Sequence, residues 1–149
     1  MTLIEAMVTV AILAILAAIA IPNMRDWIVR SRIQNTANAM RDALANAKFE
    51  AIRHGRSVEF CTDAANRRWQ VRLTGPQIQV LRQGEWPASV TVTPDASLIP
   101  SGGEHCLVFR PTSIPNHDPG ELWRASMDGK TCAIEVLSNV VRLTPPDCP

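Results

Sequence analysis

The sequence predicts an α+β fold: a long N-terminal helix that packs, through its second half, on an antiparallel β-sheet head. Residues 1–24 are almost uncharged, residues 25–54 carry apolar side chains at helical spacing, and residues 55–149 change to a period of two with many prolines and glycines. A helix followed by a run of strands is typical of α+β domains. We therefore divide the chain into an apolar helix (1–24), its amphipathic continuation (25–54) and a β-rich globular head (55–149).

The first segment has the composition of a membrane-spanning helix. Between Ala6 and Ile21 no residue is more polar than Thr9, and Glu5 is the one ionisable side chain before Arg25. An uncharged run of about 16–18 residues reaches roughly 25 Å at helical rise, which is near the lower limit for a bilayer core. Its apolar residues lie on every face, unlike those of a helix with one buried stripe. A charge inside such a segment is costly and commonly functional, so Glu5 is a candidate site residue.

The order of charges around this segment differs from that of a signal peptide. Arg25, Arg30 and Arg32 follow the apolar run and no cation precedes it, whereas a signal peptide begins with cations and ends in a cleavage site of small residues. Residues 21–24 (IPNM) do not resemble such a site. We therefore expect a mature sequence from whose start a basic leader has been removed.

The helix is expected to continue to residue 54 with a changed character. Pro22 has no backbone N–H and its ring clashes with the preceding turn, so we predict a kink or local unwinding near residues 18–22. His54 is followed by Gly55, the usual residue after a helix C-terminus. Between Pro22 and His54, apolar residues recur at steps of four and three and form one stripe, opposite a polar face. The stripe consists of Ile33, Ala37, Met40, Leu44, Ala47 and Ala51.

After Gly55 the pattern predicts a meander of short strands that form a curved sheet. Strands are expected over residues 58–61, 68–73, 77–80, 90–93, 106–110, 122–127, 131–137 and 140–143. Asp128-Gly129 is a strong hairpin signal between two of them. Residues 94–103 and 111–120, which contain several prolines and glycines, are expected to form two long loops.

Four cysteines lie far apart, without the C-x-x-C spacing of a zinc site or a thioredoxin-like motif. An even number in a small extracytoplasmic head predicts two disulfides, for which three pairings are possible. We favour Cys132–Cys148, which would tie the C-terminal tail to the last strands, and Cys61–Cys106 inside the sheet.

The residues do not indicate a catalytic or metal centre. His105 and Cys106 are adjacent in a predicted strand, so their side chains point to opposite faces and cannot act together. The histidines lack metal-ligand spacing, and the acids show no calcium-loop pattern. We therefore expect no enzymatic activity, no cofactor and no metal.

The charge balance does not favour nucleic-acid binding, because residues 1–53 carry six cations and four acids and the remainder carries nine and ten. Trp69, Trp86 and Trp123 are interpreted as core residues. Arg67, Arg68 and Arg72, close to Trp69 in sequence, could instead hold single-stranded DNA by phosphate contacts and stacking, although a solvated strand face is the simpler interpretation. These three arginines form the alternative site.

The N-terminal sequence Thr2-Leu3-Ile4-Glu5, followed by residues 7–17 and 19–22, resembles that of type IV pilins and type II secretion pseudopilins. The resemblance implies that a prepilin peptidase cuts before Met1, where the family usually has Phe, and methylates the new amine. It also implies that Glu5 pairs with the N-terminal amine of a neighbouring subunit in a filament. A buried carboxylate needs a cation. A cation that the neighbouring subunit presents at a fixed axial offset also sets the register between the two helices.

Residues 49–58 (FEAIRHGRSV) resemble the helix-to-strand junction of the GspH/FimT branch of this family, which includes minor pilins and a minor pseudopilin. The resemblance implies a pilin-like fold and a non-enzymatic filament subunit whose partners are other pilins or pseudopilins. It implies a single pass through the bacterial inner membrane, N-terminus in the cytoplasm and head in the periplasm, until an assembly platform moves the subunit into a surface pilus or a periplasmic pseudopilus. A major pilin is the first alternative.

A second alternative is DNA uptake, because some FimT proteins bind DNA through a C-terminal Gly-Arg-x-Arg motif. The corresponding stretch here is Val141-Arg142-Leu143-Thr144. Arg142 matches the motif, but its glycine and second arginine are absent. One cation neutralises too few phosphates for strong binding, so DNA is a less favoured partner.

Overall fold

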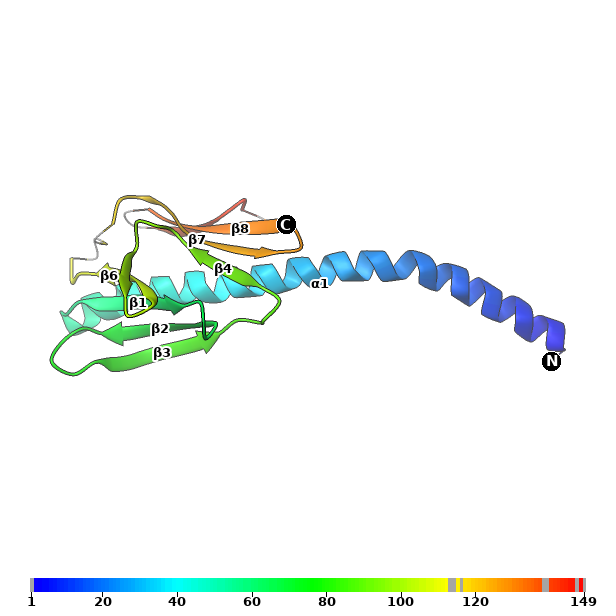
Figure 1. Ribbon diagram of the computed structural model, residues 1–149, viewed down its shortest axis with the longest axis horizontal. Coiled ribbons are helices and arrows are strands. Elements are labelled where there is room, and N and C mark those ends of the chain that lie inside the picture. Colours follow the sequence, from blue (N-terminus) through cyan, green and yellow to red (C-terminus); the bar gives the residue numbers. More distant parts are fainter. Residues whose placement is uncertain (1, 113–114, 116, 138–139, 147, 149) are drawn as a thin grey trace.

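A computed structural model describes residues 2–112, 115, 117–137, 140–146 and 148, and the side chains of these residues except residues 20–23, 99 and 101. Met1 therefore lies outside the described residues. One helix, α1 (Leu3–His54), has a first half that projects freely and a second half that lies against a head of short strands (Figure 1). Its 52 residues extend about 80 Å at helical rise.

The described part of the head contains two antiparallel sheets, whereas the sequence analysis expected one. The larger sheet has the strand order β3-β2-β1-β6-β5, and the smaller has the order β4-β7-β8-β9. The strands are β1 (Val58–Asp63), β2 (Arg68–Leu73), β3 (Gln79–Glu85), β4 (Thr91–Pro94), β5 (Ile99–Ser101), β6 (Glu104–Phe109), β7 (Gly120–Met127), β8 (Lys130–Val136) and β9 (Val141–Thr144). Helix α1 contacts β1 and β2 of the larger sheet and β7, β8 and β9 of the smaller.

Two strands differ from the prediction. β5 lies inside the first expected loop, where Pro100 pairs with His105 of β6. Proline is tolerated there because β5 is an edge strand. β3 begins at Gln79 and continues to Glu85, beyond the expected end at residue 80. It is the other edge strand, and Ile78 and Val80 are 66% and 46% exposed, so the alternation that predicted burial here was misleading.

The core forms where both sheets meet the second half of α1. The six side chains of the predicted stripe, residues 33–51, are all fully buried. The three tryptophans expected in the core are buried as well. Trp123 packs edge-to-face on Phe60, with ring centroids 5.0 Å apart, and its indole N–H donates to Thr62 Oγ1 at 3.0 Å. This hydrogen bond satisfies a polar group that burial would otherwise leave without a partner.

The helix ends as the sequence predicts. Gly55 adopts the left-handed conformation with φ 58°, and its N–H points to the carbonyl of Ile52. Toward the other end, α1 is continuous across residues 18–22 and curves between the head and the N-terminus (Figure 1). The side chain of Pro22 lies outside the described residues, so a kink caused by that proline stays a prediction.

Two disulfides join distant parts of the head. Cys61 and Cys106 are directly paired residues of β1 and β6, with Cα atoms 4.1 Å apart. Cys132 on β8 is bonded to Cys148 in the C-terminal tail. These are the two pairs that the sequence analysis favoured.

The β2–β3 pairing depends on a glycine. Gly84 lies opposite Trp69, whose indole covers it. A Cβ atom at residue 84 would lie 2.4 Å from Cζ2 of Trp69, whereas one at Gly120 would meet no atom within 4 Å. Trp69 is also in contact with Phe60, at 6.1 Å between ring centroids, so the ring cannot move without disturbing the core.

We expect Gly84→Ala to lower the free energy of unfolding by about 1–3 kcal/mol, because the new methyl group overpacks the Trp69 site. Gly120→Ala, the matched control, should change it by less than about 0.5 kcal/mol. Urea unfolding of the detergent-solubilised chain, followed by tryptophan fluorescence, measures both. Equal stability of the two variants would contradict the proposed packing of Trp69 on Gly84.

Candidate assembly interface

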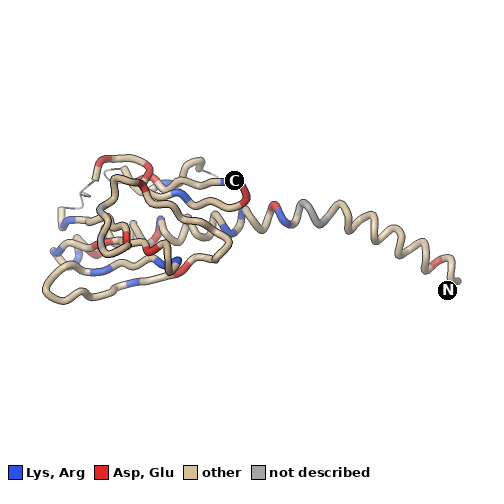
Figure 2. Tube along the Cα trace, viewed as in Figure 1, with Lys and Arg blue, Asp and Glu red and all other residues tan. Residues whose placement is uncertain are grey.

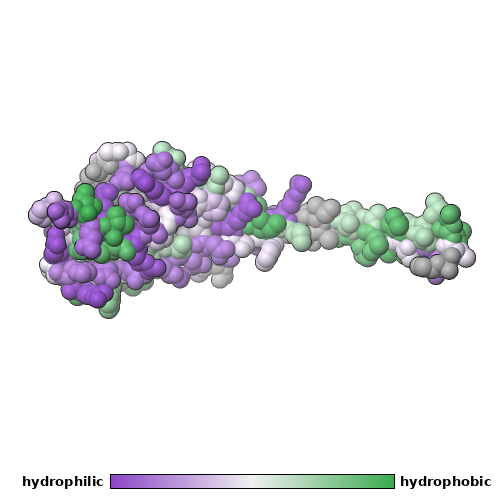
Figure 3. Space-filling view, turned by 90° about the horizontal axis from the view of Figure 1, so that it is seen from below, coloured by the Kyte–Doolittle hydropathy of each residue, from purple (hydrophilic) through white to green (hydrophobic). Residues whose placement is uncertain are grey.

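The first half of α1 presents an apolar surface that the head does not cover. We call residues 3–24 the apolar segment. Residues 3–19 and Met24 are all exposed, Leu3 to 81%. Figure 3 shows this part of the helix as a hydrophobic rod that emerges from a mostly hydrophilic head. Within it, 18 consecutive residues are apolar enough to cross a membrane, and none is buried against the rest of the chain. Such a surface requires lipid or another protein to cover it.

Glu5 lies in the first turn of α1, surrounded by this apolar surface. Its backbone N–H bonds to the carbonyl of Thr2 at 3.1 Å. Among the described residues its carboxylate has no hydrogen-bond or ion-pair partner. Thr9, by contrast, satisfies its hydroxyl within the helix by donating to the carbonyl of Ala6 at 2.8 Å. Among the described side chains of the segment, the one polar group that needs an external partner is therefore an acid.

The head meets the helix immediately after the apolar segment. Lys130, at the start of β8, forms an ion pair with Asp26 at 2.8 Å. The hydrogen bond and the charge of Lys130 lower the pKa of Asp26 below its usual range. Further along, Gln34 Nε2 donates to the backbone carbonyl of Cys148 at 2.8 Å. The hairpin turn and the C-terminal tail thus hold the helix where the apolar segment ends.

The sequence analysis did not identify this junction. Nothing in the spacing of Asp26 and Lys130, more than a hundred residues apart, indicates that they meet. Trp27 was also not singled out, although a tryptophan that directly follows an apolar run is a recognisable signal of a membrane interface.

The arginines proposed for DNA contact do not form one surface. Arg72 Nη1 and Nε bond to Glu104 at 2.8 Å and Glu59 at 3.1 Å. On the same strand, Arg68 lies 3.3 Å from Asp63.

Arg142 is on β9, in the other sheet, and bonds to Glu135 at 3.0 Å. Arg67 is exposed in the β1–β2 turn, and Trp69 is buried, so the group offers no ring for base stacking. Figure 2 shows acids and bases interspersed over the head.

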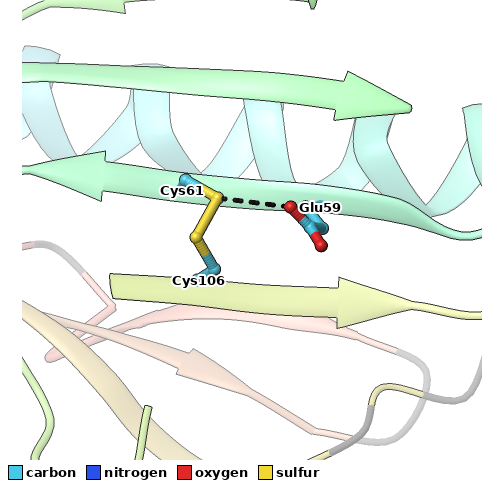
Figure 4. Close-up of side chains that lie close together, drawn as sticks. All are labelled: Glu59, Cys61 and Cys106. Atoms are coloured by element: carbon cyan, nitrogen blue, oxygen red, sulfur yellow. Dashed lines mark hydrogen bonds between the residues drawn. A yellow bond between two sulfur atoms is a disulfide. The ribbon is translucent and has the colours of Figure 1, made fainter. Parts of the chain in front are cut away.

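Glu59, Cys61 and Cys106 form the one described cluster with the composition of a metal site (Figure 4). The Glu59 carboxylate approaches Cys61 Sγ to 3.9 Å. Both sulfur atoms are bonded to each other, however, and a metal is bound by free thiolates. Arg72 already bonds to the carboxylate. This cluster therefore has a structural role, in which the disulfide and the ion pairs fasten β1, β2 and β6 together.

Asp63 ends β1 with a set of bonds that fixes the β1–β2 turn. Its carboxylate accepts hydrogen bonds from the side chain of Asn66 at 2.6 Å and from the backbone N–H of Asn66 at 3.0 Å. These bonds, with a smaller contribution from Arg68, lower the pKa of Asp63 below its ordinary value. The ionised form is thus favoured in the folded head.

Because the pKa of Asp63 is lower in the folded chain, its contribution to stability is complete above the ordinary pKa of about 3.9 and is lost as the pH falls through the lowered value. We expect Asp63→Asn to reduce the loss of stability between pH about 6 and about 3. Urea midpoints across this range measure the effect, with Asp118→Asn, at an exposed position, as the control. An unchanged acid dependence in Asp63→Asn would contradict the assignment.

Comparisons with known proteins agree with this architecture. A family model described as type II transport protein GspH matches residues 36–129, the second half of the helix and most of the head. The minor pseudopilin EpsH from the type 2 secretion system of Vibrio cholerae superposes with a TM-score of 0.59 at 14% identity, over 77% of this chain and 98% of that chain. The type IV minor pilin FimU of Pseudomonas aeruginosa gives 0.61 at 13%, over 76% and 93%. No curated protein sequence matches. The predicted α+β, pilin-like fold is confirmed.

Proposed function

We propose that this chain is a structural subunit, a minor pilin or minor pseudopilin, which assembles through the apolar segment of α1. The chain belongs to the GspH family of type II transport proteins. The observation that carries this proposal is the uncovered apolar surface, with an acid in its first turn that has no partner among the described residues. Neighbouring helices of the same kind would cover the surface and supply a cation. Proteins of this family are structural subunits, and no step of the proposed role involves catalysis.

Before assembly, the apolar segment would hold the subunit in the bacterial inner membrane, with its N-terminus in the cytoplasm and its head in the periplasm. A prepilin peptidase would expose and methylate the amine of Met1. An assembly platform would then transfer the helix from lipid into a bundle of helices. Both surroundings are apolar, so the transfer need not expose the segment to water.

The role of Glu5 follows from the cost of its charge. An ionised carboxylate in an apolar surrounding is unfavourable by several kcal/mol unless a cation is close. The Met1 amine of a neighbouring subunit is a cation at one fixed position along that helix. Subunits would therefore be stable in the register that joins the two groups, and less stable in others.

The similarity to the minor pseudopilin EpsH and the minor pilin FimU favours a minor subunit over a major pilin. The subunit stoichiometry of a purified filament distinguishes the two. DNA uptake is not favoured, because Arg68, Arg72 and Arg142 are already paired with carboxylates. Phosphate binding would have to break these pairs.

We predict that Glu5→Leu leaves the chain inserted in the membrane but lowers its incorporation into filaments by roughly tenfold or more, the equivalent of about 1.4 kcal/mol. Leucine preserves the apolar surface and removes the acid. Thr9→Val is the matched control: it also replaces a polar residue of the segment, but one whose hydroxyl is satisfied within its own helix.

Incorporation is measured by shearing filaments from cells and blotting the sheared and membrane fractions. Equal incorporation of Glu5→Leu and wild type would contradict the role given to the carboxylate. A Glu5→Leu chain that is absent from the membrane fraction would show that the acid acts in insertion instead.

A further inference from the structure

We propose that Trp27, Arg25 and Arg30 form an interfacial anchor that binds anionic phospholipid head groups, so that the head rests directly on the membrane surface before assembly. This inference rests on the proposed function, because it requires the apolar segment to lie in a bilayer. Beyond the proposed function, the inference specifies how deep the chain lies in the membrane and which lipid groups the chain contacts.

Trp27 differs from the other tryptophans of the chain. It is 68% exposed, whereas Trp69, Trp86 and Trp123 are each 7% exposed or less. It follows the uncharged run by three residues. An indole combines a large apolar ring with one N–H donor, which suits the boundary between hydrocarbon and head groups.

The contact between helix and head determines how close the head lies to the boundary between hydrocarbon and head groups. Lys130 reaches Asp26, the residue before Trp27, so no free length of helix separates the head from the apolar segment. In Figure 1 the turn that joins β7 to β8 lies at the end of the head that faces the apolar segment. With Met24 at the edge of the hydrocarbon, Trp27 lies about 4.5 Å farther out and Arg30 about 9 Å. The head-group region is roughly 5–8 Å thick on each side of a bilayer. The backbone of Arg30 therefore lies at its outer limit, and its long side chain, which in a helix leans toward the N-terminus, can reach back into it.

The charges near Trp27 complement a lipid phosphate. Residues 25–32 of α1 carry Arg25, Arg30, Arg32 and Asp26, and the β7–β8 turn that meets them carries Asp128 and Lys130. Lys130 is paired with Asp26, and Arg32 donates to Ser89 Oγ at 3.0 Å. Arg25 is exposed, and Arg30 makes only a long ion pair among its described contacts, 3.8 Å from its Nη2 to the Asp26 Oδ2 that Lys130 approaches at 2.8 Å. Arginine binds phosphate through two parallel N–H groups, so both can bind head groups while the indole enters the interface.

The test uses the full chain reconstituted in vesicles of phosphatidylcholine and phosphatidylglycerol. Trp27→Phe serves as the reference, so the difference between the wild-type and variant spectra isolates the Trp27 emission. The lipids carry bromine either near the glycerol end or near the methyl end of their acyl chains. Flotation after carbonate extraction reports separately whether the chain is inserted.

We expect the Trp27 emission to be shifted to shorter wavelength than that of an indole in water, and to be quenched more by the shallow bromine than by the deep one. Arg25→Gln combined with Arg30→Gln should weaken the shallow quenching in phosphatidylglycerol vesicles. Arg53→Gln combined with Arg110→Gln, at the opposite end of the head, should leave it unchanged.

A chain that floats but whose Trp27 emission is water-like, or quenched most by the deep bromine, would overturn the anchor and leave the proposed function standing. A chain that does not float would overturn both. Equal quenching in the two arginine double variants would overturn the part of the proposal that assigns phosphate binding to Arg25 and Arg30.

Discussion

An apolar helix surface of this length is incompatible with water, because the cost of exposing it grows with its area. The head covers the second half of α1 and leaves the first half bare. The two halves therefore belong to different surroundings: one is the centre of a folded core, and the other requires lipid or neighbouring helices. In the proposed assembly the Glu5 carboxylate would find its cation on another chain.

The head is attached to the helix up to the point where the surroundings change. Stripe residues such as Ile33 and Leu44 are fully buried between the sheets. The pair Asp26–Lys130 and the bond from Gln34 to the carbonyl of Cys148 then fix the hairpin turn and the tail on the helix. The Cys132–Cys148 disulfide ties that tail to β8. A pull on the head or on the apolar segment would thus be transmitted through many contacts.

Features that depend on neighbouring residues could be predicted from the sequence. The stripe from Ile33 to Ala51 follows from helical spacing, the helix end from Gly55, and the β7–β8 turn from Asp128-Gly129. The division into two sheets and the existence of β5 depend on pairings between distant strands, which no local pattern specifies. The exposed Ile78 and Val80 carried the signal of a buried strand, but an edge position leaves them uncovered.

The candidate interface could be predicted only in part. Glu5 was evident because an acid in an apolar run is rare. The junction at Asp26 and the carboxylate partners of Arg68, Arg72 and Arg142 were not, since each depends on tertiary contacts. The pairing of these arginines explains why a basic group in the sequence does not become a basic surface in the structure.

Photo-cross-linking from residue 13 in assembled filaments tests the central claim most directly, because Leu13 is exposed in the middle of the apolar segment. With a photoreactive residue in its place, the account predicts cross-links to the apolar segments of neighbouring subunits, identified by mass spectrometry. Cross-links confined to the head of the same chain, with none to another subunit's helix, would contradict it.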